Sequence, residues 1–312
     1  MKGIARLARE LTALQGSTLV LTHATADLDA CACALVLARA INAEARTPDR
    51  PTGSAWRVLE NYGRGILEYG GEKYDNLVLV DVSNADLLGG VDPHKFKKII
   101  AIDHHYHNNH LKADYSHIEH ERASCAEIVF DACNALGARL SPTERALLLS
   151  AVLHDSAFFK SANSQTLRTA AQMADGLDYA AVVAKATPNG EYGEIKAVQK
   201  AVAAAELVRY GRFTIGIAAV KAFELQSAAA LVEMGCDYAL AVDEEHGKMS
   251  CVKRVGAPGT AGKIMEKAGK AFGGSGGGHE CAAGSHGQPK KTQKALETAK
   301  KEIMLLLGNN NL

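Results

Sequence analysis

The sequence predicts an α/β protein whose N-terminal part is built on a parallel sheet with helices on both faces. Three short apolar runs, Thr18–Thr22, Leu77–Val82 and Ile99–Asp103, are rich in branched residues and have the length of buried strands. Stretches with helical periodicity and polar loops separate the strands along the chain. Alternating strands and helices are typical of βαβ units, and therefore of parallel strand pairing.

The other elements follow from periodicity and capping patterns. Ser124-x-x-Glu127 and Ser141-Pro142-Thr143-Glu144 are capping-box sequences that open two helices. Residues 43–56 contain two prolines and a glycine, which indicates a loop, with a hidden strand as the alternative. The predicted helices cover 1–15, 29–42, 124–136, 142–154, 166–177, 195–209, 225–234, 261–272 and 292–307. Further strands are predicted at 213–220, 238–242 and 248–252.

A chain of 312 residues is long enough for two domains. The strongest break in the helical pattern is Thr187-Pro188-Asn189-Gly190, which we interpret as a hinge. It predicts a first domain over 1–187, a helical connector over 188–209 and a smaller α/β domain over 210–312.

Composition restricts the class of protein. The 35 Lys and Arg residues balance the 35 Asp and Glu residues, which argues against a protein that coats long nucleic acids. The seven cysteines are odd in number and form no CxxC pair, so we expect reduced thiols in a reducing compartment. The longest apolar run, Ala30–Ala38, is too short to span a bilayer. A cytoplasmic protein without a membrane partner is expected.

Histidines and aspartates follow the three predicted strands and one apolar helix. Ligands of open α/β sheets bind at the carboxyl ends of the strands, so the first three groups should converge. Crowded carboxylates repel one another and need a cation, and mixed His and Asp ligands suit Mn²⁺, with Mg²⁺ or Co²⁺ as alternatives. The candidate residues are His23, Asp27, Asp29, Asp81, Asp103, His104, His105 and Asp155.

Two alternatives need no metal. Asp27 and Asp29 can cap the helix that follows them, and Asp81 alone can be a turn residue after a strand. Asp103-His104-His105 at a strand end is harder to explain by packing. The four groups together, in this order, favour a site for two divalent cations about 3.5–4 Å apart.

The same residues resemble the four motifs of the DHH phosphoesterase superfamily. This superfamily includes RecJ-type exonucleases, nanoRNases with 3′-phosphoadenosine 5′-phosphate phosphatase activity, cyclic-dinucleotide phosphodiesterases and family II pyrophosphatases. Residues 273–284 resemble the glycine-rich signature of the DHH-associated substrate-binding domain. The sequence departs from the family at Thr25-Ala26, where Asn-Pro is usual, and at Ser156, where Thr is usual.

The resemblance implies a role for each residue. His23 and Asp27 would hold one Mn²⁺, Asp29, His104 and Asp155 the other, and Asp81 would bridge both. Catalysis would also involve Asp103, which orients a histidine, and His105, which faces the substrate phosphate. The implied substrate-binding residues in the C-terminal domain are Arg254, Gly277, Gly278 and His279.

The expected activity is hydrolysis of short oligonucleotides or small phosphorylated nucleotides by two-metal activation of water, as in nanoRNases. The alternatives are a single-strand-specific 5′ exonuclease and a cyclic-dinucleotide phosphodiesterase. A non-catalytic nucleotide-binding module is ranked last, because all six candidate metal ligands are present. The oligomeric state is open, and a homodimer is one of the states considered. Four histidines after the DHH motif are interpreted as loop residues near the active-site entrance: His107, His110, His117 and His120.

Overall fold

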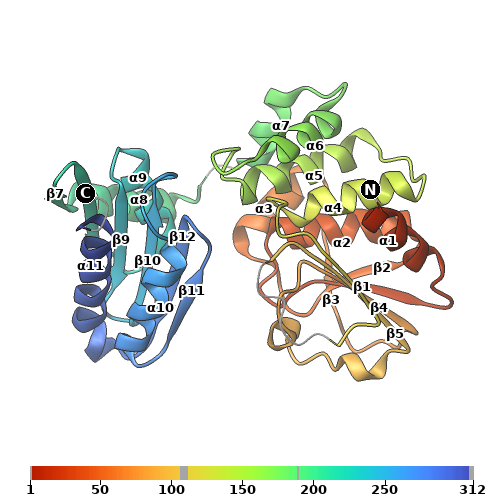
Figure 1. The fold of residues 1–312 in the computed structure, drawn as a ribbon, viewed down its shortest axis with the longest axis horizontal. Helices are drawn as coiled ribbons and strands as arrows, with labels where there is room; N and C mark the ends of the chain where they lie inside the picture. Colours follow the sequence, from red (N-terminus) through yellow and green to blue (C-terminus); the bar gives the residue numbers. More distant parts are fainter. Residues whose placement is uncertain (1, 106–111, 188–189, 309–312) are drawn as a thin grey trace. The chain divides into compact units, whose positions relative to one another are not determined.

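The computed structural model describes residues 2–105, 112–187 and 190–308, and it forms two compact units, Met1–Pro188 and Asn189–Leu312 (Figure 1). His107 and His110 lie outside the described residues. Among the described residues, no helix is both long and apolar enough to cross a membrane. All seven cysteines are free thiols, and six of them are buried.

The first unit is built on a six-stranded sheet in which every neighbouring pair is parallel, as predicted. The strand order is β3-β2-β1-β4-β5-β6. The order changes direction between β1 and β4, which makes this the topological switch point. The strands are β1 Thr18–Leu21, β2 Glu44–Thr47, β3 Leu67–Glu68, β4 Asn76–Val80, β5 Lys98–Asp103 and β6 Tyr115–Ile118.

Helices cover the two faces of this sheet unequally. One face packs on α-helices, and its core joins Val20, Val78 and Ile100 to apolar residues of several of them. The opposite face, with Leu19, Leu77 and Ile99, is covered by the 3₁₀-helices η1 Ala85–Leu88 and η2 Pro93–Lys95 with their flanking segments. The α-helices are α1 Lys2–Thr12, α2 Leu28–Ala40, α3 Gly53–Asn61, α4 Cys125–Ala135, α5 Pro142–Asp155, α6 Ser164–Ala174 and α7 Tyr179–Ala186.

The second unit is a mixed six-stranded sheet in the order β11-β12-β10-β9-β8-β7, in which only β8 and β9 are parallel. It has two apolar cores, one built with residues of α10 and α11 and the other with residues of α8 and α9. The strands are β7 Glu206–Tyr210, β8 Phe213–Ala219, β9 Tyr238–Asp243, β10 Lys248–Lys253, β11 Ser275–Gly278 and β12 Ala282–His286. The helices are α8 Tyr192–Ala203, α9 Glu224–Glu233, α10 Ala261–Phe272, the 3₁₀-helix η3 Pro289–Lys291 and α11 Thr292–Gly308.

Three local predictions were wrong or incomplete. The helix expected to reach residue 209 ends at Ala203, because 206–210 form the edge strand β7. Residues 43–56, expected to form a loop with a hidden strand as the alternative, contain the strand β2 and the start of α3. His117 is not a loop residue, since it lies buried in β6 and its Nε2 is 2.8 Å from Glu119 Oε1.

Candidate metal centre

The predicted histidines and aspartates of the first unit meet at the switch point of its sheet. His23 and Asp27 follow β1, Asp81 follows β4, and Asp103 is the last residue of β5. Because these strands are parallel and adjacent, their carboxyl ends lie at the same edge. The motifs, which are far apart in the sequence, therefore form one cluster in space.

One half of the cluster consists of His23, Asp27 and Asp81. One candidate ligand atom from each lies within 4.8 Å of the other two. His23 Nε2 is 3.8 Å from Asp81 Oδ2, while its Nδ1 is 3.3 Å from Thr25 Oγ1. Asp27 is also the N-cap of α2, with Oδ1 accepting a hydrogen bond of 3.1 Å from the Ala30 amide. The capping alternative for Asp27 is thus correct, and it leaves Asp27 within the cluster.

The other half consists of Asp29, His104 and Asp155, which are grouped equally closely. His104 Nε2 is 3.5 Å from Asp155 Oδ2 and 4.0 Å from Asp29 Oδ2. It is also 3.5 Å from Asp81 Oδ1, so Asp81 and His104 join the two halves. Asp81 therefore occupies the central position that a bridging ligand requires.

Asp29 is held by α4 and does not cap α2, contrary to the capping alternative. Its Oδ1 accepts from Ser124 Oγ at 3.2 Å and from the Ala126 amide at 2.9 Å. Its Oδ2 accepts from the Cys125 amide at 2.6 Å. The carboxylate is fully buried and lies against the N-terminus of α4, which supplies these donors.

Asp103 orients His105. Its Oδ1 lies 2.8 Å from His105 Nδ1 and also accepts from the amides of His104 and His105. Burial acts to raise the pKa of Asp103, but the hydrogen bond and charge of His105 outweigh it, so the net pKa is lowered. Burial acts to lower the pKa of His105, and its bond to Asp103 reverses this, so the pKa is raised.

The cluster carries more negative charge than its own groups compensate. Burial, and next the charges of Asp29 and Asp27, raise the pKa of Asp81 far above its usual range. The same causes in the same order raise the pKa of Asp155. Burial lowers the pKa of His23, which favours the neutral imidazole that a metal ion needs.

Two buried atoms of the cluster have no hydrogen-bond partner among the described residues, namely Asp81 Oδ1 and His104 Nε2. Unsatisfied buried polar atoms are rare, and a bound ion is one of the features that explain them. Both atoms are of the kind that coordinates divalent transition metals. The residues therefore fit a pair of cations, one in each half.

The backbone is strained at two points beside the cluster. Asp81 has a φ of 58°, in the left-handed region. Ala157, Phe158 and Phe159, which begin two residues after Asp155, have φ angles of 48°, 56° and 67°. Such conformations are costly for residues other than glycine and concentrate at functional sites. Here they turn the chain sharply after β4 and after α5, where the two aspartates are presented.

The glycines of the second unit serve mainly close packing. A side chain on Gly276 would collide with the backbone of Met265 in α10. A Cβ on Gly278, whose φ is 143°, would stand 2.7 Å from Ala283 Cα. Gly277 differs, because nothing lies within 4 Å of its Cβ position. Gly277, Gly278 and His279 lie at the turn end of the hairpin of β11 and β12, where Gly278 and His279 are exposed.

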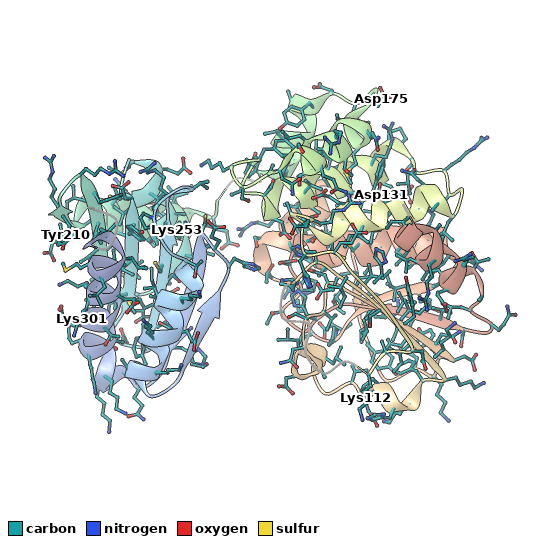
Figure 2. All side chains as sticks on the ribbon, viewed as in Figure 1. Lys112, Asp131, Asp175, Tyr210, Lys253 and Lys301 are labelled. Carbon is teal, nitrogen blue, oxygen red and sulfur yellow. The ribbon has the colours of Figure 1, made fainter. Side chains whose placement is uncertain are left out.

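Arg254 lies at the same end of the second sheet, because the amide of Lys253 donates to Cys281 O. Its guanidinium is engaged by Asp237 Oδ1, at 2.9 Å from Nε and 2.5 Å from Nη2. The neighbouring Lys253 belongs to the second unit (Figure 2). It is buried, and its Nζ donates to Ala257 O at 3.0 Å. A substrate anion at Arg254 would therefore compete with, or share, an existing ion pair.

Sequence reasoning missed the groups that hold the cluster in place. Arg122 accepts the hydrogen of His104 Nδ1 through its carbonyl oxygen at 3.2 Å. Ser124 was recognised only as a helix cap, although its hydroxyl also bonds Asp29. The available signal was a single arginine two residues before the capping box and close to two glutamates. This pattern does not identify a partner far away in the sequence.

The fold and site together define a class: α/β proteins with a His and Asp cluster at the switch point of a parallel sheet, followed by a second α/β unit. Comparison with family models makes this specific. Residues 17–153 match the N-terminal domain of the DHH family, and residues 228–305 match the DHHA1 domain. The chain therefore contains the N-terminal domain of the DHH family, followed by a DHHA1 domain.

Similar proteins support the same architecture. An uncharacterized protein of Methanocaldococcus jannaschii is 26% identical over 92% of both chains. An exopolyphosphatase-related protein from Bacteroides fragilis superimposes with a TM-score of 0.79 over 98% of both chains, at 16% identity. RecJ of Thermus thermophilus in complex with Mn²⁺ gives a TM-score of 0.60 at 14% identity, over 97% of this chain and 55% of that one. At these identities the structural likenesses establish the fold.

Proposed function

We propose that this chain hydrolyses short oligonucleotides or small phosphorylated nucleotides with two divalent cations held at the metal centre. The observation that carries the proposal is the pair of adjoining ligand sets, His23/Asp27/Asp81 and Asp29/His104/Asp155, joined where Asp81 meets His104. Two metal sites that share a carboxylate are a recurrent solution for hydrolysis of phosphate esters. Mn²⁺ is the first ion to test, because it is present in the RecJ structure.

The residues divide the work. Bound cations would supply Lewis-acid activation of water and would neutralise charge that develops on the phosphate. Asp81 would hold both ions, because it belongs to one ligand set and contacts His104 of the other. Asp103 would keep His105 oriented through the Nδ1 bond, so that the ring presents Nε2 to a phosphate oxygen.

The second unit would bind the rest of the substrate. We propose Gly277, Gly278, His279 and Arg254 as the contacting residues. The open space at Gly277 and the exposure of this turn support that role, because a ligand can approach the backbone without meeting a side chain. The zero net charge of the chain favours small substrates over a long polyanion bound along the surface.

A substrate panel tests the proposal. The ion-free protein is supplied with Mn²⁺, Mg²⁺ or Co²⁺ and given labelled dinucleotides, long single strands, 3′-phosphoadenosine 5′-phosphate and cyclic dinucleotides. We expect the highest kcat/KM on dinucleotides or on the 3′-phosphoadenosine compound. Long strands cleaved as fast as dinucleotides would contradict the short-substrate preference, and no turnover of any member would contradict the enzymatic function.

A further inference from the structure

We propose that residues 122–126, the segment that leads into α4, determine the geometry of one half of the metal centre, the Asp29/His104/Asp155 half. In this proposal Arg122 is the positioning residue that holds the segment in place. The inference rests on the proposed function, because it concerns the same cations. It assigns a role to residues that touch neither a cation nor the substrate.

The segment binds Asp29 at three points. Ser124 Oγ and the Ala126 amide donate to Oδ1, and the Cys125 amide donates to Oδ2. Three donors from one helix start leave the carboxylate a single orientation, with Oδ2 turned toward His104. The same segment therefore decides where the Asp29 ligand atom lies.

The segment also fixes His104. Because a carbonyl oxygen only accepts hydrogen bonds, the contact between His104 Nδ1 and Arg122 O places the hydrogen on Nδ1. In the neutral tautomer with this hydrogen, the lone pair is on Nε2, which is the form that coordinates a metal. Two of the three ligands in this half are thus oriented by five consecutive residues.

Arg122 anchors the segment through its side chain. The guanidinium is buried and reaches Glu119 at 2.7 Å, Asp131 at 2.5 Å, and Glu127 and Thr169 at 3.4 Å. These partners come from the preceding loop, from α4 (Asp131 is labelled in Figure 2) and from α6. A buried guanidinium is costly to desolvate and is retained only with such pairing. The planar guanidinium contacts both α4 and α6, and these contacts fix the position of the Arg122 backbone carbonyl.

The other half of the centre is held differently. His23 Nδ1 contacts Thr25 Oγ1, and Asp27 accepts from the Ala30 amide, so both are held by neighbours in their own segment. Loosening residues 122–126 should therefore weaken one cation site and spare the other. A general loss of folding would not produce this asymmetry.

The test is a Mn²⁺ titration of the ion-free full-length protein by isothermal calorimetry. We expect Ser124→Ala and Arg122→Met to lower one of two binding constants by about 10- to 100-fold and to leave the other unchanged. Ser141→Ala removes a helix-capping serine at α5, and Ser150→Ala removes a buried serine hydroxyl bonded to Tyr62, both without contact to the cluster. These controls should bind two ions as the unaltered protein does.

Thermal unfolding midpoints of all variants separate loss of folding from loss of positioning. If Arg122→Met does not fold, Ser124→Ala alone decides the test, because it removes a single hydroxyl. Equal weakening of both sites, or no weakening of either, would overturn this inference and leave the proposed function standing. An unaltered protein that binds no Mn²⁺ would overturn the proposed function and the inference together.

Discussion

The metal centre of the first unit and the β11–β12 hairpin of the second are the two parts of the sequence most dense in motif residues, and they are built on opposite principles. In the metal centre, buried carboxylates face one another, and Asp81 Oδ1 and His104 Nε2 have no hydrogen-bond partner among the described residues. In the hairpin, Gly276 and Gly278 fit against α10 and β12 with no room for a side chain. The first region has charge and polar atoms that its own residues do not compensate, whereas the second is filled by its own packing.

This difference teaches how to weigh the two motifs. Unsatisfied buried polar groups cost free energy and persist where a ligand compensates them. A run of glycines has a sufficient explanation in close packing. Gly277 is the exception within this run, because it lies beside an open space and close packing does not explain it. In the hairpin, the residues that indicate a function are therefore those at its exposed turn. In the metal centre, all of the clustered histidines and aspartates indicate one.

The largest effect is expected at Asp81. Asp81→Ala removes the ligand that joins the two halves, so we predict a fall in kcat of about 10³-fold or more, equivalent to several kcal/mol of transition-state stabilisation. The measurement is steady-state hydrolysis of a dinucleotide with Mn²⁺. Asp114→Ala is the control, since Asp114 caps the opposite end of β5 through the Ile99 amide. A rate within tenfold of the unaltered protein would refute the central role of Asp81.

A pair of glycine variants tests the packing side of the comparison. Gly276→Ala forces a side chain into the backbone of Met265 and should cost about 1–3 kcal/mol of unfolding free energy. Gly277→Ala meets nothing within 4 Å, so stability should change by less than about 0.5 kcal/mol. Urea unfolding measures both values.

The same pair separates stability from substrate binding. Gly277→Ala should raise KM and leave kcat nearly unchanged, because the added methyl group obstructs approach to the backbone and not the reacting atoms. If Gly277→Ala destabilises the chain as strongly as Gly276→Ala, packing explains the whole glycine run, and the proposed contact at Gly277 is wrong.

The pH dependence of the ion-free protein tests the charge imbalance in the metal centre. The folded state raises the pKa of Asp81, so the ionised carboxylate destabilises the fold above that pKa, and protonation at lower pH relieves it. At pH 8, the free energy of unfolding of Asp81→Asn, measured with urea, should therefore exceed that of the unaltered protein by about 1 kcal/mol or more. The advantage should shrink as the pH falls toward 5. An Asn variant that is less stable at pH 8 would show that the carboxylate is already compensated.

Glu119 provides the opposite case in the same unit, a charge that is fully compensated. Hydrogen bonds from His117 and Arg122 lower its pKa to about 2. A lowered pKa stabilises the fold above the unfolded value of 4.5, and this stabilisation is lost as the pH falls toward 2. Glu119→Gln should lower the free energy of unfolding by about 1 kcal/mol at pH 7, and by less at acidic pH, as measured by urea unfolding. Identical acid profiles would contradict the assignment.

Much of the first unit could be predicted because its central strands are buried on both faces. β1, β4 and β5 are nearly continuous apolar runs, and the polar residues that follow them mark the edge of the sheet. The outer strands, which are β2 and the two edge strands β3 and β6, are short and partly exposed, so they carry no such pattern. The candidate ligands could therefore be located from the sequence. Of the outer strands only β2 was foreseen, as the alternative to a loop over 43–56.

The remainder depended on contacts between distant parts of the chain. β7 is mostly exposed and continues an alanine-rich helical pattern, so only its pairing with β8 identifies it as a strand. The roles of Arg122 and Ser124 depend on His104 and Asp29, and nothing in the local sequence names those partners. Gly276 and Gly277 are identical in sequence, and only the position of α10 distinguishes them.

The central claim is that two cation sites act together in phosphoester hydrolysis. The most direct measurement follows the rate of dinucleotide hydrolysis while Mn²⁺ is titrated into the ion-free protein, with bound Mn²⁺ counted in the same samples. We predict two ions per chain, with hydrolysis rising as the second site fills. Full activity at one ion per chain, or activity without any ion, would contradict the account.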